Sequence, residues 1–125
     1  MQGKKILVAD DESHILSVVS LKLRNAGFEV VCAHDGAEAV EMAARERPDL
    51  LITDYHMPGL NGLEVCAKLR ESADMAKLPA IMLSARGYHL TDAELAQSGI
   101  SQMISKPFSP RQLLATVNEV LGIAA

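Results

Sequence analysis

Four short segments carry the side chains that could perform chemistry. They are Asp10-Asp11-Glu12, Asp54, Ser84 and Lys106, and each directly follows an apolar run. Oxygen ligands of this kind favour a hard cation such as Mg²⁺. Two carboxylates ~4 Å apart repel each other by about 1 to 4 kcal/mol, so grouped acids are costly without a cation between them. If these segments meet, the sequence predicts a cation site.

A carboxylate beside such a cation and a lysine is suited to attack phosphorus. In this interpretation Asp54 is the nucleophile, and the metal and Lys106 spread the charge of the transferring group. Taken singly, each residue has a plainer explanation. Asp10 and Asp11 can favour a helix N-terminus, Ser84 can be a loop serine, and Lys106 a solvated charge. Phosphoryl transfer onto an aspartate therefore depends on whether the fold brings the set together.

Apolar blocks alternate with amphipathic blocks along the whole chain. Continuous apolar runs predict strands over residues 5–10, 28–33, 49–53, 80–84 and 100–105. Apolar residues at three- and four-residue steps predict helices over 15–26, 37–44, 63–69, 90–97 and 113–121. Asp35 is a predicted N-cap, and Gly27, Pro48 and Gly99 end helices. The repeated strand–helix order predicts a parallel sheet with helices on both faces.

Parallel sheets of this kind bind ligands beyond the carboxyl ends of their strands. The predicted strands place Asp10, Asp54, Ser84 and Lys106 at four of these ends. The second strand leads to His34-Asp35, which we expect at the edge of the sheet and away from the site. The sequence thus predicts one rim that carries the candidate residues.

Composition limits the classes of function. The 125 residues, of which 49% are hydrophobic and 22% charged, suit one globular domain over 1–125 with its core at 4–121. A net charge of −4 argues against direct nucleic-acid binding. No apolar run approaches the ~20 residues of a membrane span, and the start, MQGKKILVADD, is unlike a signal peptide. Cys32 and Cys66 stand in apolar surroundings, which favours buried reduced thiols and a cytoplasmic location.

Five quoted segments carry a family resemblance: ILVADDE, HDGAEAV, RPDLLITDYHMPGLNGLEV, PAIMLSA and ISKPFSP. In this order, and with these spacings between Asp54, Ser84 and Lys106, the chain resembles the receiver domain of two-component response regulators, including the single-domain chemotaxis type. The resemblance covers residues 4–121. It implies a flavodoxin-like, doubly wound five-stranded parallel sheet of order 2-1-3-4-5 with five helices.

The resemblance also implies a role for each matching residue. Asp54 would be the phosphoacceptor. Asp10 and Asp11, with Asp54 and the main-chain carbonyl of His56, would hold Mg²⁺, with Mn²⁺ as an alternative ion. Ser84 would turn to bind the phosphoryl group.

Lys106 would form an ion pair with that group, and the Lys106–Pro107 bond would be cis. Receivers usually carry Tyr or Phe three residues before the lysine, as a switch residue. Here that position is Met103, which can fill alternate gaps but offers no aromatic hydroxyl. His56 and Arg86 match positions that modulate the lifetime of the phosphoryl group.

As a whole, the resemblance implies a phosphorylation-controlled switch and not an enzyme that turns over an external substrate. The phosphoryl donor would be a sensor histidine kinase or a phosphotransfer protein. Output would pass through the face of the fourth helix, fifth strand and fifth helix to an effector protein or a C-terminal effector domain. No direct contact with nucleic acid or membrane is expected.

Three other interpretations remain open at this point. A magnesium-dependent phosphatase would use an aspartyl-phosphate intermediate, although His56 stands where many carry a second acid. A flavin-binding module would need a phosphate loop rich in Ser, Thr or Gly, and DDESH is anionic. A degenerate receiver would serve only for docking, which the complete acidic set does not favour. Turnover of a phosphate ester, yellow colour and absent phosphorylation would distinguish them.

Overall fold

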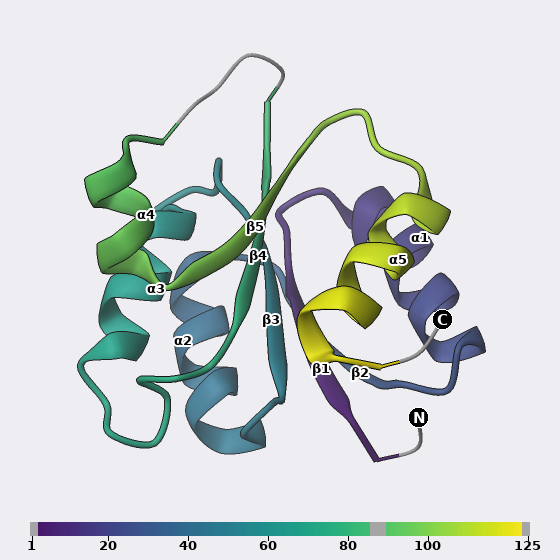
Figure 1. Cartoon of the computed structure of the whole chain (residues 1–125), viewed down its shortest axis with the longest axis horizontal. Coiled ribbons are helices and arrows are strands. Elements are labelled where there is room, and N and C mark those ends of the chain that lie inside the picture. Colours follow the sequence, from purple (N-terminus) through teal and green to yellow (C-terminus); the bar gives the residue numbers. More distant parts are fainter. Residues whose placement is uncertain (1–2, 86–89, 124–125) are drawn as a thin grey trace.

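The computed structural model describes residues 3–85 and 90–123 (Figure 1). Five strands alternate with five helices in these residues, as the sequence predicts. Their bounds are β1 (Lys5–Ala9), α1 (Ser13–Asn25), β2 (Glu29–Ala33), α2 (Gly36–Glu46), β3 (Leu50–Asp54), α3 (Gly62–Arg70), β4 (Ala80–Ser84), α4 (Asp92–Ser98), β5 (Ile100–Ser105) and α5 (Pro110–Leu121).

The strands form one parallel sheet in the order β2-β1-β3-β4-β5. Helices α1 and α5 cover one face, and α2, α3 and α4 cover the other (Figure 1). The predicted flavodoxin-like, doubly wound sheet is confirmed. Among the described residues, none of the helices combines the length and apolar character that crossing a bilayer requires.

The central strands are buried on both faces because helices lie on both sides of the sheet. Successive residues of a strand point to opposite faces, so Leu7 and Leu51 pack in the core beneath α2, α3 and α4. Ile6 and Ile52 pack in the core beneath α1 and α5. This two-sided burial explains why β1, β3 and β4 appear in the sequence as unbroken apolar runs.

Three strands differ from the prediction at their ends. The first stops at Ala9, one residue earlier than predicted. Phe28 belongs to the turn that ends α1, because its N–H donates to the carbonyl of Leu23 (3.1 Å), and β2 therefore begins at Glu29. The third strand begins and ends one residue later than predicted, and its last residue, Asp54, pairs with Leu83 of β4. The candidate nucleophile is thus held by the sheet itself.

The helix caps and the cysteine thiols largely agree with the sequence predictions. The Asp35 carboxylate accepts a hydrogen bond from the Glu38 N–H (2.8 Å) at the start of α2. Gly99 ends α4 with φ of 73°, a left-handed conformation that glycine adopts without steric cost. Cys66 is buried, whereas Cys32 is half-buried and lies 3.1 Å from the Ser20 hydroxyl. Both are free thiols, and Cys32 is more exposed than predicted.

Candidate functional site

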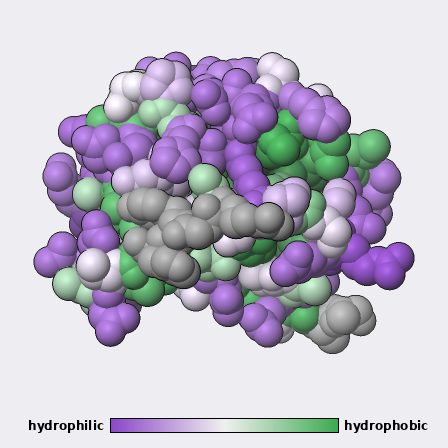
Figure 2. Space-filling model, turned by 90° about the horizontal axis from the view of Figure 1, so that it is seen from above, coloured by the Kyte–Doolittle hydropathy of each residue, from purple (hydrophilic) through white to green (hydrophobic). Residues whose placement is uncertain are grey.

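The carboxyl ends of four strands bring the candidate residues to one rim. Asp10 follows β1, Asp54 and Ser84 are the last residues of β3 and β4, and Lys106 follows β5. Figure 2 looks down on this rim, where hydrophilic residues predominate and hydrophobic residues gather on the side of α1 and α5. His34, after the edge strand β2, instead lies 3.1 Å from the Glu38 carboxylate.

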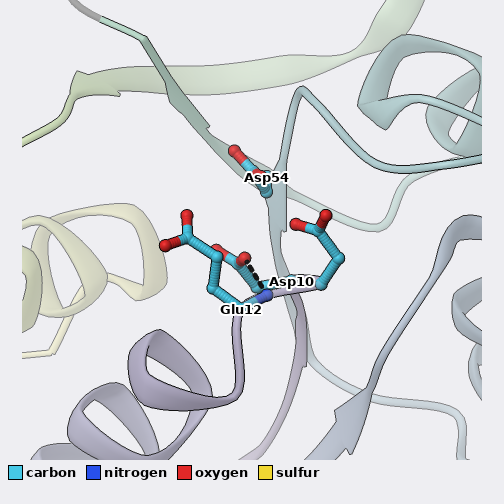
Figure 3. Close-up of side chains that lie close together, drawn as sticks. Asp10, Glu12 and Asp54 are labelled. Carbon is cyan, nitrogen blue, oxygen red and sulfur yellow. Dashed lines mark hydrogen bonds between the residues drawn. The ribbon is translucent and has the colours of Figure 1, made fainter.

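Four acids form the centre of the site. Carboxylate oxygens of Asp10, Asp11, Glu12 and Asp54 all lie within 4.8 Å of one another (Figure 3). Asp10 and Asp54 are buried, and Asp11 and Glu12 are exposed. The Glu12 N–H donates to Oδ1 of Asp10 (2.9 Å), which holds that carboxylate in place. Asp11, Glu12 and Asp54 border a pocket of about 350 Å³, which His56, Ala85 and Lys106 also line.

Lys106 is the cation of this site among the described residues. Its ammonium lies 3.3 Å from Oδ2 of Asp10 and 3.3 Å from Oδ1 of Asp54. Oε1 of Glu12 is 3.1 Å away. The main-chain N–H of Lys106 donates to the carbonyl of Ser84 (2.8 Å), so the sheet positions the start of this loop. The peptide bond from Lys106 to Pro107 is cis, as the resemblance implied.

The electrostatics of the site follow from burying negative charge. Burial raises the pKa of Asp10 to about 6, and the Glu12 N–H opposes this rise. Burial also raises the pKa of Asp54, against the effect of Lys106. Burial acts to lower the pKa of the Lys106 ammonium, but the charges of Asp10, Glu12 and Asp54 raise it overall. The site therefore holds more negative charge than its lysine balances.

Two further predicted residues, His56 and Ser84, lie beside the acids. The His56 N–H donates a hydrogen bond to the Asp54 carboxylate. The His56 side chain is exposed, and its ring meets that of Tyr55 edge-on at 4.7 Å between centroids. Ser84 is buried at the end of β4, one position beyond Leu83, the partner of Asp54.

The other predicted residues lie further along the chain. Met103 is half-buried on β5 and packs against the core beneath α2, α3 and α4. Arg86 lies outside the described residues. Glu12 belongs to the acidic segment that the sequence analysis singled out, but it received no role there, because it follows two acids that already satisfy the family pattern. Its place at the same strand end as Asp10 and Asp11 is the signal that could have given it a role.

The donor set suits magnesium. All four acidic groups offer hard oxygen ligands, and Mg²⁺ binds through one or two carboxylates together with waters and phosphate oxygens. The unbalanced buried charge of Asp10 and Asp54 is what a divalent cation would neutralise. Asp10, Asp11 and Asp54 therefore fit the ion that the resemblance implies.

Comparisons with known proteins agree with this geometry. The family model described as "Response regulator receiver domain" matches residues 6–118. The alkaline phosphatase synthesis transcriptional regulatory protein PhoP of Bacillus subtilis is 39% identical over 119 residues, which are 95% of this chain and 49% of PhoP. This chain thus spans about half the length of that curated relative.

Two solved structures are also similar. The chemotaxis response regulator CheY4 of Vibrio cholerae is 34% identical, with a TM-score of 0.87 over 94% of this chain and 98% of its own. The receiver domain of a sensor histidine kinase from Pseudomonas aeruginosa, with a magnesium ion coordinated in its active site cleft, is 28% identical. Its TM-score is 0.85 over 96% of this chain and 98% of its own.

The chain belongs to the receiver-domain family of two-component response regulators. Receiver domains are signalling switches that are phosphorylated on aspartate and bind Mg²⁺ at an acidic pocket, and they are generally not enzymes for external substrates.

Proposed function

We propose that this chain is a switch that accepts a phosphoryl group on Asp54 from a sensor histidine kinase or a phosphotransfer protein. One observation carries the proposal: the Asp54 carboxylate is held by the sheet at the edge of a pocket, 3.3 Å from the Lys106 ammonium, which also contacts the buried acid Asp10. A carboxylate with these neighbours is positioned to attack phosphorus.

The transfer forms one bond and breaks one. An Asp54 carboxylate oxygen attacks the phosphorus of a phosphohistidine, the P–N bond breaks, and the nitrogen keeps the electron pair. Asp10, Asp11, Asp54 and the His56 carbonyl would hold Mg²⁺, or Mn²⁺ in its place. When bound, the ion supplies positive charge to the phosphoryl oxygens. Lys106 supplies a second positive charge from the side of β5.

The signal then passes from the site to a binding surface. In the proposal the buried Ser84 hydroxyl donates to the phosphoryl group, and Met103 adjusts its packing on β5. The face of α4, β5 and α5 would thereby change its affinity for a partner. The partner is an effector protein or an effector domain joined to the receiver core at 4–121. We expect no direct contact with nucleic acid or membrane, and a cytoplasmic location.

His56 and Arg86 modulate the lifetime of the phosphoryl group in this proposal. His56 lines the pocket beside Asp54, so its side chain can limit the approach of the water that hydrolyses the acyl phosphate. Replacing His56 and Arg86 by alanine should speed the loss of the phosphoryl group. An unchanged decay rate would refute this role.

Intact mass spectrometry tests the proposed function. The protein is incubated with acetyl phosphate and either Mg²⁺ or EDTA, beside Asp54→Ala. We expect one phosphoryl adduct on the wild type, only with Mg²⁺, and none on Asp54→Ala. An adduct on both proteins, or on neither, would overturn the proposal. Sustained turnover of a phosphate ester by the wild type, lost in Asp54→Ala, would favour a phosphatase instead.

A further inference from the structure

The three carboxylates around Lys106 differ in how freely they can move. Asp10 and Asp54 are buried at strand ends, with side chains 0% and 4% exposed. The Glu12 side chain is 59% exposed, and it makes the shortest of the three contacts at 3.1 Å. Glu12 is therefore the partner that can follow the ammonium if Lys106 moves.

The Glu12 side chain faces the site instead of capping α1. Glu12 is the N-cap residue of α1, yet within the described part of the chain its side chain accepts no capping hydrogen bond. Figure 3 shows this side chain turned back from the start of α1 toward the acids. Its main chain meanwhile holds Asp10 through the N–H. The main chain and the side chain of Glu12 thus each contact a residue of the site.

A divalent cation and the Lys106 ammonium would compete for the same oxygens. Oδ2 of Asp10 and Oδ1 of Asp54 each lie 3.3 Å from the ammonium, and both residues belong to the proposed magnesium site. Like charges at such distances repel, so a cation held by Asp10 and Asp54 weakens two of the lysine's contacts. The contact with Glu12 is the one that does not depend on those oxygens.

We propose that Glu12 is a positioning residue that keeps the Lys106 ammonium beside the site when a divalent cation occupies Asp10 and Asp54. This inference deepens the proposed function and rests on its magnesium site. Before the cation binds, Glu12 is one of three partners of Lys106, and afterwards it is the main one. An interaction that is stronger in the bound state raises the affinity for the cation.

Two other roles for Glu12 make different predictions. If Glu12 were itself a ligand, or acted only through its charge on the cation, its loss would weaken Mg²⁺ binding whether or not Lys106 is present. If the pair were an ordinary solvated contact, its loss would change nothing. The positioning role alone makes the effect of Glu12 depend on Lys106, which a double-mutant cycle measures.

The test is Mg²⁺ affinity by isothermal titration calorimetry at one pH and ionic strength. The proteins are wild type, Glu12→Gln, Lys106→Met and the double variant, with Glu41→Gln on α2 as the matched loss of an exposed carboxylate. We expect Glu12→Gln to bind Mg²⁺ about three- to fivefold more weakly and Lys106→Met to bind more tightly than wild type. In the Lys106→Met background, Glu12→Gln should have no further effect.

A fifth variant separates the length of the Glu12 side chain from its charge. Glu12→Asp keeps the charge on a shorter side chain, so we expect it to resemble Glu12→Gln. Equal weakening by Glu12→Gln in both backgrounds would overturn the positioning role and leave the proposed function intact. Unchanged affinity in Glu12→Gln would overturn it too. Absence of Mg²⁺ binding by the folded wild type would overturn both this inference and the magnesium site of the proposed function.

Discussion

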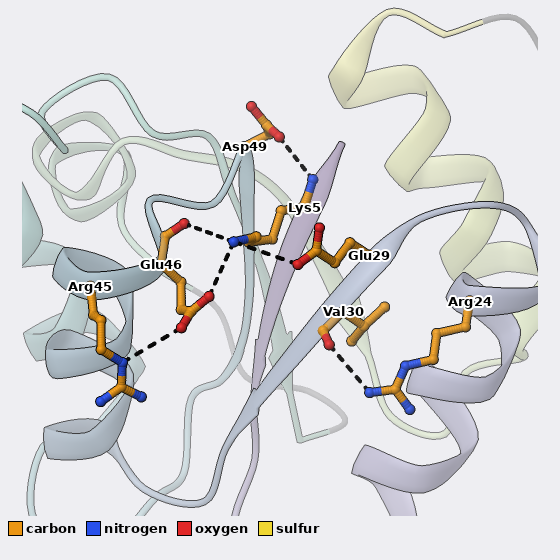
Figure 4. Close-up of polar contacts among 7 residues, drawn as sticks. All are labelled: Lys5, Arg24, Glu29, Val30, Arg45, Glu46 and Asp49. Atoms are coloured by element: carbon orange, nitrogen blue, oxygen red, sulfur yellow. Dashed lines mark hydrogen bonds and ion pairs between the residues drawn. The ribbon is translucent and has the colours of Figure 1, made fainter. Parts of the chain in front are cut away.

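Two lysines lie among acids at opposite ends of the same sheet. At the amino end, Lys5 begins β1, and its ammonium lies 3.1 Å from Glu46 and 3.6 Å from Glu29 (Figure 4). At the carboxyl end, Lys106 contacts Asp10, Glu12 and Asp54. The contacts look alike, but hydrogen bonding to Lys5 lowers the pKa of Glu46, whereas burial raises that of Asp10.

The difference lies in where the acids are placed. The side chains of Glu29 and Glu46 are 61% and 28% exposed, so both stay in contact with water, and the ion pair with Lys5 stabilises them as charged groups. Asp10 and Asp54 are buried away from water, and the single Lys106 ammonium does not compensate for their lost hydration. The amino end is a surface ion-pair cluster that joins α2 to the sheet. The carboxyl end carries more negative charge than Lys106 balances, which favours the binding of a cation there.

The largest expected effect comes from removing a buried charge at the carboxyl end. Asp10→Asn should stabilise the metal-free protein at pH 7.5, by about 1–2 kcal/mol once solvent screening is allowed for, because the carboxyl pKa of about 6 lies above its ordinary value. Added Mg²⁺ should stabilise this variant less than the wild type. Urea denaturation with and without Mg²⁺ measures both effects.

The matched change at the amino end should have the opposite sign. Glu46→Gln removes a carboxylate that Lys5 stabilises, so it should lower stability slightly and leave the response to Mg²⁺ unchanged. If Asp10→Asn also destabilised the metal-free protein, the two ends would not differ as described.

The pH dependence should separate the two ends as well. An acid whose folded-state pKa is raised binds its proton first in the folded state, so Asp10 makes the metal-free protein more stable as pH falls through about 6 toward 3.8. We expect a gain of about 1 kcal/mol between pH 7.5 and 5. Saturating Mg²⁺ should remove this gain.

Below about pH 5, the acids at the amino end should dominate the pH dependence of stability. The pKa of Glu46 is lowered from its ordinary value of 4.5, so its contribution is present above that value and is lost as pH falls through its folded-state pKa. Urea midpoints between pH 3 and 7.5 would show a maximum near pH 5. A metal-free stability that rises steadily toward pH 7.5 would contradict the raised pKa of Asp10.

The smallest effect is expected at Lys5. Lys5→Met removes the half-buried ammonium that pairs with Glu29 and Glu46, and it should lower the thermal midpoint slightly, with no change in Mg²⁺ affinity. Its counterpart Lys106→Met should change Mg²⁺ affinity. Equal Mg²⁺ affinities in the two variants would remove the functional distinction between the lysines.

The fold could be predicted because burial on two faces leaves a simple signal. Unbroken apolar runs such as the one that ends at Asp54 can be recognised without knowing what covers them. Boundaries were less certain because they depend on single hydrogen bonds. The N–H of Phe28 donates to the carbonyl of Leu23 at the end of α1, and this contact is visible only in the folded structure.

The candidate site could be predicted at the level of strand ends, and not at the level of contacts. Parallel strands bring Asp10, Asp54 and Ser84 to one rim whatever their side chains do. The Glu12–Lys106 contact joins residues 94 positions apart through two flexible side chains, so no local pattern encodes it. The half-burial of Cys32 likewise depends on how α1 covers the edge strand.

Locating the phosphoryl group tests the central claim most directly. The protein is phosphorylated with acetyl phosphate and Mg²⁺, and borohydride then reduces the acyl phosphate, which converts the modified aspartate to homoserine. Peptide mass spectrometry should find this conversion at residue 54 alone. Conversion at Asp10 or Asp11, or a phosphoryl adduct that resists borohydride, would contradict the account.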